Sequence, residues 1–264
     1  VQKCSEVAKL WLTPAFDAKT QEDVKQMLDS KDKTALVDAF YKNLEFGTGG
    51  LRGIMGAGTN RMNKYIVGMA TQGFANYLKQ AFSDKKEIAV VVGHDCRNNS
   101  RFFAETVADI FSANDIKVYL FESLRLTPEI SFAIRQLKAQ GGVNITASHN
   151  PKEYNGYKAY WDDGAQVLSP HDTGIISEVN KVTIDQVKFQ PNNDLIKIIG
   201  GEMDIDYLNA VHEALIDQDV INRQKDLCIV YSPLHGTGRV VIPAALRTWG
   251  FQNINVVKEQ MVID

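Results

Sequence analysis

One serine stands between a short apolar stretch and a proline, in the segment Gly141-Gly-Val-Asn-Ile-Thr-Ala-Ser-His-Asn-Pro151. The apolar residues predict a buried strand that delivers Ser148 to a tight turn, and Pro151 stops further strand pairing. Ligands of α/β proteins bind where parallel strands end, so a hydroxyl there, with His149 and backbone amides beside it, suits covalent chemistry. Taken alone, however, such a grouping is more often an ordinary turn.

A serine hydrolase is the first chemistry to weigh, and the segment argues against it. The G-x-S-x-G elbow is absent, because Ala147 and His149 flank the serine. His149 also follows Ser148 directly, which places its ring poorly for an ordinary triad base.

A possible acid or base follows in Tyr154-Asn-Gly-Tyr-Lys-Ala-Tyr160. The Asn155-Gly156 pair predicts a tight turn that folds the chain back into a neighbouring strand and brings Lys158 near Ser148. A lysine among other cations loses part of its proton affinity and can then transfer protons. The plainer interpretation is a solvated lysine on an edge strand.

Two further segments could bind an anion. Residues 45–58 carry six glycines around Arg52, too many for a helix or a central strand, and predict a loop with unusual backbone angles that presents N–H groups beside a guanidinium. The segment matches no nucleotide-binding fingerprint, so a structural bend is equally plausible. Ser232-Pro-Leu-His-Gly-Thr-Gly238 lies between a predicted strand and a predicted helix, which makes His235 a candidate ligand contact.

A third polar turn, Gly93-His-Asp-Cys-Arg-Asn-Asn-Ser100, also joins a strand to a helix. Asp95 and Arg97 are expected to pair and brace that turn, and Ser100 is expected to cap the helix. Both roles are structural rather than catalytic.

The elements that position these segments alternate in type. Helical spacing fills the chain up to about Leu44 and again from Asn63 to Phe82. Strands are then predicted at residues 88–92, 117–121, 143–146 and 157–161, with helices at 100–112 and 128–137 between them. This alternation predicts an α/β fold with a mixed, mostly parallel sheet and helices on both faces.

A second unit begins after residue 201. A helix is predicted before it, near residues 173–182. Within the unit, helices are predicted near residues 206–215 and 239–249, and strands at 227–231 and 254–257. The last two strands with their helix form one βαβ crossover, which is too small to bury a core. We therefore expect one full domain over residues 1–201 and part of a second over residues 202–264.

Composition limits the classes of function. The 264 residues carry a net charge of −3 with a pI near 6.0, which argues against a nucleic-acid binder with a broad basic face. No apolar run approaches the roughly 20 residues of a membrane helix, and no secretory signal is visible. Three widely spaced cysteines fit a reduced, cytoplasmic protein. The chain begins at Val1 and stops without a tail, so we expect a fragment.

Taken together, the motifs resemble the α-D-phosphohexomutase superfamily, which contains the phosphoglucomutases and phosphomannomutases. The resemblance rests on Thr146-Ala-Ser-His-Asn-Pro151 followed by Asn155-Gly-Tyr-Lys158, and it is reinforced by Phe46-Gly-Thr-Gly-Gly-Leu-Arg-Gly53 and Leu234-His-Gly-Thr-Gly238. It covers essentially the whole chain in order. The helical N-terminus and residues 53–63 resemble the branch that includes phosphopentomutases.

The resemblance implies four α/β domains around a cleft, one Mg²⁺ ion and a sugar bisphosphate intermediate. Ser148 would be the phosphoserine that donates and accepts the phosphoryl group and supplies a metal ligand. Arg52, Lys158 and His149 would complete the catalytic set. Substrate-binding residues implied in the same way are Thr48, Gly49, Asn150 and His235.

One departure is clear. The family binds Mg²⁺ through a D-G-D-x-D-R loop in its second domain, and no such segment occurs here. The sugar-selecting and phosphate-binding loops of the third and fourth domains are also missing, so we expect negligible mutase activity from this chain alone.

Three alternatives stay open: a non-catalytic sugar-phosphate-binding module of the same fold, a phosphopentomutase, and the disfavoured serine hydrolase. The preferred sugar and the oligomeric state do not follow from the sequence.

Overall fold

The computed structural model describes residues 1–47 and 49–263, and its centre is a six-stranded sheet in the order β1-β5-β4-β2-β3-β6. β2 (Ala89–His94), β3 (Lys117–Phe121), β4 (Gly141–Ile145) and β6 (Ile196–Ile199) run parallel to one another. β5 (Tyr154–Trp161) pairs antiparallel with β4 and with β1 (Gly50–Ile54). The predicted mixed, mostly parallel α/β fold is therefore confirmed.

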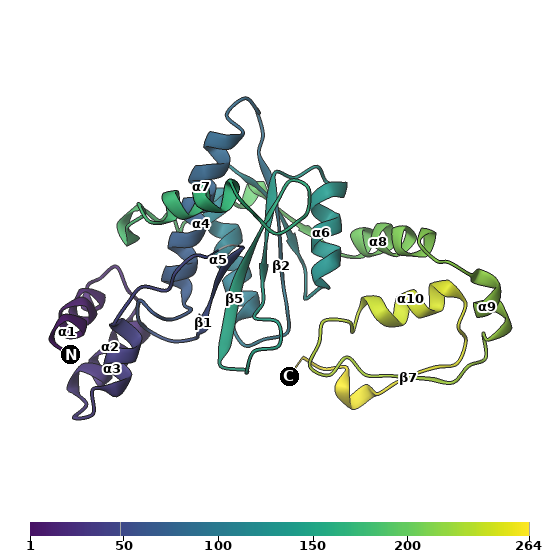
Figure 1. Ribbon diagram of the computed structural model, residues 1–264, viewed down its shortest axis with the longest axis horizontal. Helices are drawn as coiled ribbons and strands as arrows, with labels where there is room; N and C mark the ends of the chain where they lie inside the picture. Colours follow the sequence, from purple (N-terminus) through teal and green to yellow (C-terminus); the bar gives the residue numbers. More distant parts are fainter. Residues whose placement is uncertain (48, 264) are drawn as a thin grey trace.

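Helices cover both faces of this sheet (Figure 1). The larger core lies between the sheet and α4 (Lys64–Ala81), α5 (Ser100–Ala113) and α7 (His171–Val179), where Phe74, Phe111 and other side chains are fully buried. A second core lies on the opposite face beneath α6 (Thr127–Gln136), where Ile130 and Ile134 pack on Val91. The strands between the two layers are apolar on both sides, as a buried parallel sheet requires.

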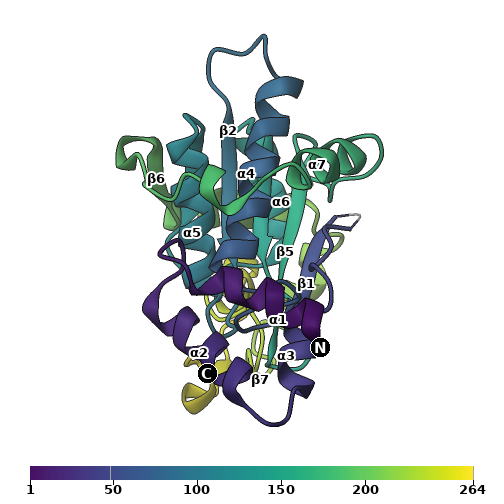
Figure 2. The same ribbon diagram turned by 90° about the vertical axis from the view of Figure 1, so that its left-hand side faces the viewer.

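The N-terminal helices form a third packed group, which lies in front of the sheet in Figure 2. They are α1 (Gln2–Lys9), α2 (Ala18–Asp29) and α3 (Thr34–Phe40). Trp11 contacts Phe16, Phe40 and Tyr65, so an aromatic cluster ties the group to the first turn of α4. The expected helical N-terminus is confirmed.

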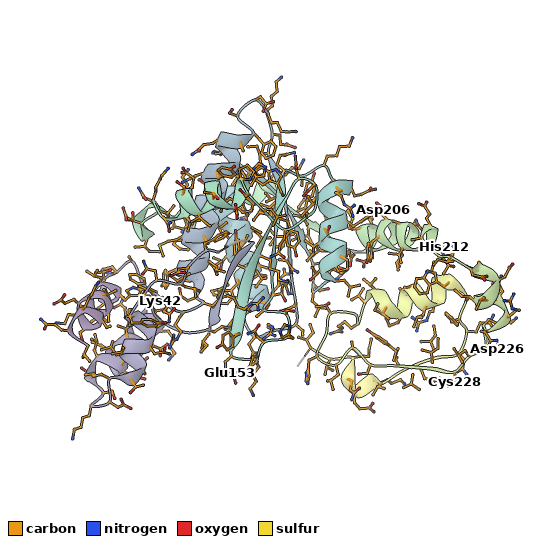
Figure 3. The ribbon with its side chains drawn as sticks, viewed as in Figure 1. Lys42, Glu153, Asp206, His212, Asp226 and Cys228 are labelled. Atoms are coloured by element: carbon orange, nitrogen blue, oxygen red, sulfur yellow. The ribbon has the colours of Figure 1, made fainter. Side chains whose placement is uncertain are left out.

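The C-terminal unit extends away from the sheet (Figure 1). It contains α8 (Gly201–Glu213), α9 (Gln218–Arg223), β7 (Ile229–Tyr231), α10 (Val241–Trp249) and β8 (Ile254–Val256), and β7 pairs parallel with β8. Figure 3 places His212 on α8 and Asp226 and Cys228 at the far end of this unit. Large apolar side chains are exposed in this unit, including Ile216, Val230 and Leu234.

The sequence prediction missed β6 and misread two other places. Residues 45–58 are not wholly a loop, because five of them form the edge strand β1. Gly49 and Gly50, where the chain enters this strand, have positive φ angles of 82° and 135°, which favour glycine. Asn155-Gly156 is not a turn, since both residues lie inside β5. No described helix is long and apolar enough to cross a membrane.

Candidate active site

Ser148 lies on the loop that joins β4 to β5, which we call the serine loop (residues 146–153). This loop follows the carboxyl end of β4 in the middle of the sheet, and Figure 3 shows Glu153 at its end. Ser148 is exposed and has a φ of 56°, in the left-handed region that a residue with a Cβ rarely adopts. Its amide donates to Thr146 Oγ1 at 3.1 Å.

His149 contacts the serine more closely than its adjacency predicts. Its Nδ1 lies 3.3 Å from Ser148 Oγ. A triad base also needs a third group that orients its ring, and within the described residues the imidazole of His149 has no other hydrogen-bond partner. The arrangement therefore gives no support to a serine hydrolase.

Ser148 opens onto a cavity of about 880 Å³. Its lining joins the serine loop to the residues after β2, to the N-terminal turn of α6 and to the loop after β7. The lining residues are Asp95, Cys96, Arg97, Asn98, Arg125, Thr127, Asn144, Thr146, Ser148, His149, Asn150, Lys152, His235, Gly236 and Thr237.

The predicted contact from the second unit reaches this cavity. The loop 232–238 approaches the sheet domain, and the Cys96 thiol donates to the carbonyl oxygen of His235 at 3.3 Å. His235 and Asn150, both predicted to bind substrate, thus line the same cavity as Ser148 and His149.

Arg52 reaches the serine loop from the edge strand β1. Its Nη1 donates to Asn150 Oδ1 at 2.8 Å, and its side chain is exposed. Arg52 is opposite Gly156 in the β1–β5 pairing, so the register of the two strands fixes the position of Arg52 along the sheet. A charged donor is thereby placed beside the loop that carries Ser148.

Lys158 lies on β5 opposite Asn144, which lines the cavity. Burial lowers the pKa of the Lys158 ammonium, and the positive charge of Arg52 lowers it further, while Asp95 acts in the opposite direction. A strand position, and not the expected tight turn, therefore places this lysine, yet its electrostatic surroundings are those of a proton-transfer group.

The remaining predicted residues are Gly49, Thr48 and Ser100, and neither of the two that the structure describes lines the cavity. Gly49 lies just before β1, and its carbonyl oxygen accepts from the Ala159 amide at 3.0 Å; it is not among the cavity-lining residues. Thr48 falls outside the described residues. Ser100 does not cap α5 with its side chain, because its hydroxyl donates to Asp95 Oδ1 at 2.6 Å and Asn99 takes the capping position.

Two arginines that line the cavity make contacts that the sequence did not predict. Arg97 pairs with Asp95 as expected, with 3.3 Å between Nε and Oδ2, but it also donates to carbonyl oxygens of the serine loop. Arg125, which is 1% exposed, donates to both carboxylate oxygens of Asp204 on α8 at 2.6 and 3.0 Å. It thereby links the sheet domain to the C-terminal unit.

Glu129 lies fully buried beside this ion pair, 3.9 Å from Arg125 Nε, and its carboxyl oxygens accept no hydrogen bond within the described part of the chain. Burial raises the pKa of the Glu129 carboxyl to about 8, and the nearby carboxylate of Asp204 adds to this effect. These surroundings therefore favour the protonated, neutral form of Glu129.

The described residues do not build a magnesium site. No group of three or more His, Cys, Asp or Glu side chains among them could hold a metal ion. Asp95, the carboxylate that lines the cavity, already accepts from Arg97 and Ser100. The expected Mg²⁺ ion thus stays a prediction.

The fold and the cavity define an α/β/α domain whose parallel strands present a serine and several cationic side chains at one end. Residues 43–185 match the family model described as phosphoglucomutase/phosphomannomutase, alpha/beta/alpha domain I. Because the match covers more than half of the chain, this protein belongs to the phosphoglucomutase/phosphomannomutase family.

Curated relatives agree with this assignment. The chain is 36% identical over 251 residues to a Schizosaccharomyces pombe protein named "Probable phosphoribomutase", and 36% identical over 261 residues to the human phosphopentomutase. It is 36% identical over 247 residues to a Staphylococcus haemolyticus phosphoglucomutase. These alignments cover 94%, 95% and 91% of this chain, but only 43%, 42% and 44% of the relatives.

The fold is shared with solved structures. A Thermus thermophilus protein, described as a "putative phosphomannomutase", superposes with a TM-score of 0.71 at 24% sequence identity. The superposition covers 84% of this chain and 47% of that chain. At this identity the likeness establishes the fold alone.

Proposed function

We propose that this chain is the phosphoryl-carrying part of a phosphosugar mutase, in which Ser148 takes a phosphoryl group from one sugar phosphate and gives it to another position. The observation that carries the proposal is the position of the Ser148 hydroxyl. It is exposed at a cavity where parallel strands end, on a loop contacted by two arginines. Phosphoryl transfer demands positioning and charge stabilisation above all, and this site offers both.

The proposed reaction balances in two transfers. In the first, the bond between phosphorus and Ser148 Oγ breaks, a bond forms between phosphorus and a sugar hydroxyl oxygen, and the hydroxyl proton passes to a base. The product is a sugar bisphosphate. In the second transfer, the other phosphoryl group of the bisphosphate returns to Ser148 Oγ, and the proton is given back to the leaving sugar oxygen.

Lys158 and Arg52 have complementary parts in this scheme. Burial and the charge of Arg52 lower the pKa of Lys158, which eases the loss of its proton, so we assign to Lys158 the transfer of the sugar hydroxyl proton. Arg52 has a planar guanidinium that can donate two parallel hydrogen bonds to phosphate oxygens. His149, 3.3 Å from the serine hydroxyl, would donate to a phosphate carried there. Mg²⁺, when bound through groups outside these residues, would neutralise further charge on the phosphate.

The sugar is the open choice between two candidates. Relatives of similar identity are named for a pentose phosphate and for a glucose phosphate. The longest form of the protein, supplied with Mg²⁺, should be assayed with α-D-glucose 1-phosphate and with α-D-ribose 1-phosphate. A larger kcat/KM for glucose 1-phosphate supports a phosphoglucomutase, and a larger value for ribose 1-phosphate supports a phosphopentomutase.

Covalent labelling tests the proposal on the chain itself. The chain is incubated with α-D-glucose 1,6-bisphosphate, and the peptide covering residues 141–152 is analysed by mass spectrometry. We expect phosphate on Ser148, no label on that peptide in Ser148→Ala, and full labelling in Ser232→Ala, which alters the serine of the other cavity loop. Binding of the bisphosphate without phosphate on Ser148 would instead favour a non-catalytic binding module.

A further inference from the structure

The serine loop contains a strained residue at the position proposed to carry the phosphoryl group. Ser148 has a φ of 56°, and a residue with a side chain pays about 1 kcal/mol for this left-handed conformation. Such strain persists only where the surrounding structure determines the backbone from several directions. Groups that bond to the backbone around Ser148 must therefore stabilise this conformation.

Both terminal nitrogens of the Arg97 guanidinium donate to backbone carbonyl groups of the serine loop or of the residue that follows it. Nη2 donates to the carbonyl oxygens of Ser148 at 2.7 Å and Asn150 at 2.6 Å. Nη1 donates to those of Pro151 at 2.9 Å and Tyr154 at 3.1 Å. Four carbonyl groups spread over seven residues thus converge on one rigid, planar group.

A carboxylate fixes the guanidinium in turn. Asp95 Oδ2 lies 3.3 Å from Arg97 Nε, while Asp95 Oδ1 accepts from the Arg97 amide at 2.9 Å and from the Ser100 hydroxyl at 2.6 Å. The Ser100 hydroxyl also accepts from Nδ2 of the buried Asn155 at 2.9 Å. The network therefore connects the end of β2, the start of α5, the serine loop and β5.

These contacts use every donor that Arg97 has. A guanidinium carries five N–H groups; here three donate to the serine loop, one donates to Tyr154 at the start of β5, and the fifth, on Nε, faces Asp95. The side chain is only 11% exposed, and the carboxylate of Asp95 offsets its charge. Arg97 therefore has no donor left for a phosphate, although it lines the cavity.

We propose that Arg97 is the positioning residue of the reaction: it holds the backbone of the serine loop in the strained conformation that presents the Ser148 hydroxyl to the cavity. This assignment rests on the proposed function for its catalytic meaning. The two arginines then have different roles: Arg52 is exposed and can contact a charged substrate, whereas the donors of Arg97 bond to the backbone. A lysine could not replace Arg97, because an ammonium cannot span four carbonyl groups in one plane.

The test compares Arg97→Lys with Arg101→Lys in the same chain. Arg101 is a matched control, because it also donates to backbone carbonyl groups, those of Phe121 and Glu122, but not to the serine loop. We expect Arg97→Lys to increase amide hydrogen exchange at residues 147–154 at least tenfold while β2 and β3 stay protected. A misplacement of about 1 Å costs about 100-fold in rate, so phosphate uptake by Ser148 from α-D-glucose 1,6-bisphosphate should fall by that factor. The loss should appear in the maximal rate and not in the bisphosphate concentration that gives half of it.

A second measurement needs no variant. In the unmodified protein, NMR of the arginine side chains should show slow rotation of the Arg97 guanidinium, and fast rotation of a guanidinium that has no such partners, such as exposed Arg223. Free rotation at Arg97, or a folded Arg97→Lys chain with unchanged loop exchange and phosphate uptake, would overturn the proposal. If unmodified Ser148 takes up no phosphate but loop exchange still rises in Arg97→Lys, the proposed function fails while the structural task of Arg97 stands.

Discussion

The two loops that meet at the cavity are alike in composition and unlike in how they are held. Each follows a strand and carries a serine and a histidine: residues 146–153 after β4 and residues 232–238 after β7. Arg97 and Arg52 bond to the first loop from other parts of the sheet domain, and Thr146 Oγ1 accepts from the Ser148 amide within it. In the second loop, Ser232 Oγ accepts from the Leu234 amide at 3.2 Å, and the Cys96 thiol donates to His235 from outside the loop.

The difference follows from what lies behind each loop. The serine loop extends from a strand that is paired on both sides and covered by helices on both faces. The second loop extends from a two-stranded sheet in which no side chain is fully buried and Val230 is exposed. A loop can hold a strained, reactive conformation only where a rigid layer supports it, so chemistry is expected from the first loop and ligand contact from the second.

The largest effect expected from this comparison is a packing defect behind the serine loop. A Cβ at Gly156 would lie 2.6 Å from the carbonyl oxygen of Thr146 and 3.1 Å from that of Leu51, so Gly156→Ala forces three strands apart. We expect a loss of about 3 kcal/mol in the free energy of unfolding. In the C-terminal unit, Gly201→Ala meets nothing within 4 Å and should raise stability by about 0.5 kcal/mol, because alanine favours the helix. Thermal unfolding measures both; equal losses would contradict the contrast.

A second effect concerns the joint between the regions. The pKa of Glu129 is about 8 in the folded chain against an ordinary 4.5. Between these pH values the unfolded chain loses this proton and the folded chain keeps it, so stability falls as pH rises and levels off above 8. Glu129→Gln cannot ionise and should flatten this dependence, with a gain of at least about 2 kcal/mol at pH 8 relative to pH 5, since each pKa unit corresponds to about 1.4 kcal/mol.

Glu122→Gln is the control for this prediction. Glu122 also contacts Arg125, at 3.0 Å, but its side chain is 54% exposed, so this variant should keep the slope of the unmodified protein. Urea unfolding at several pH values distinguishes the two variants. A slope that persists in Glu129→Gln would show that another group causes it.

The smallest effect should have opposite signs in the two loops. Ser148→Gly relieves the left-handed conformation and should raise the free energy of unfolding by about 0.5 kcal/mol, while it removes the hydroxyl proposed to carry phosphate. Ser232→Gly removes the acceptor of the Leu234 amide and should lower stability by about 0.5–1 kcal/mol. Destabilisation by Ser148→Gly, measured by thermal unfolding, would mean that position 148 stores no strain.

Hydrophobic periodicity predicted most of the fold. The helix expected from Asn63 to Phe82 is α4, with Asn63 as its cap, and the strand expected at residues 117–121 is β3. These segments are recognisable because their burial pattern repeats along the chain itself. The errors at Asn155-Gly156 have a different origin: Gly156 is required by the close approach of neighbouring strands, and the buried amide of Asn155 is satisfied by Asn98 and Ser100, which are distant in sequence.

The candidate site was predicted in part for the same reason. Ser148, His149, Asn150 and His235 line one cavity, as their motifs suggested. The bonds of Arg97 to the serine loop could not be predicted, because they join residues about 50 positions apart through carbonyl groups that any residue would supply. Likewise, the raised pKa of Glu129 depends on the packing of α8 against α6, which leaves no periodic signal in the sequence.

The two outer strands of the main sheet have a further consequence. β1 and β6 are only five and four residues long, and each carries a cation, Arg52 and Lys197 respectively. Short, charged borders discourage one copy of a chain from adding to the sheet of another. We therefore expect Arg52, which donates to Asn150, also to disfavour aggregation through the edge of the sheet.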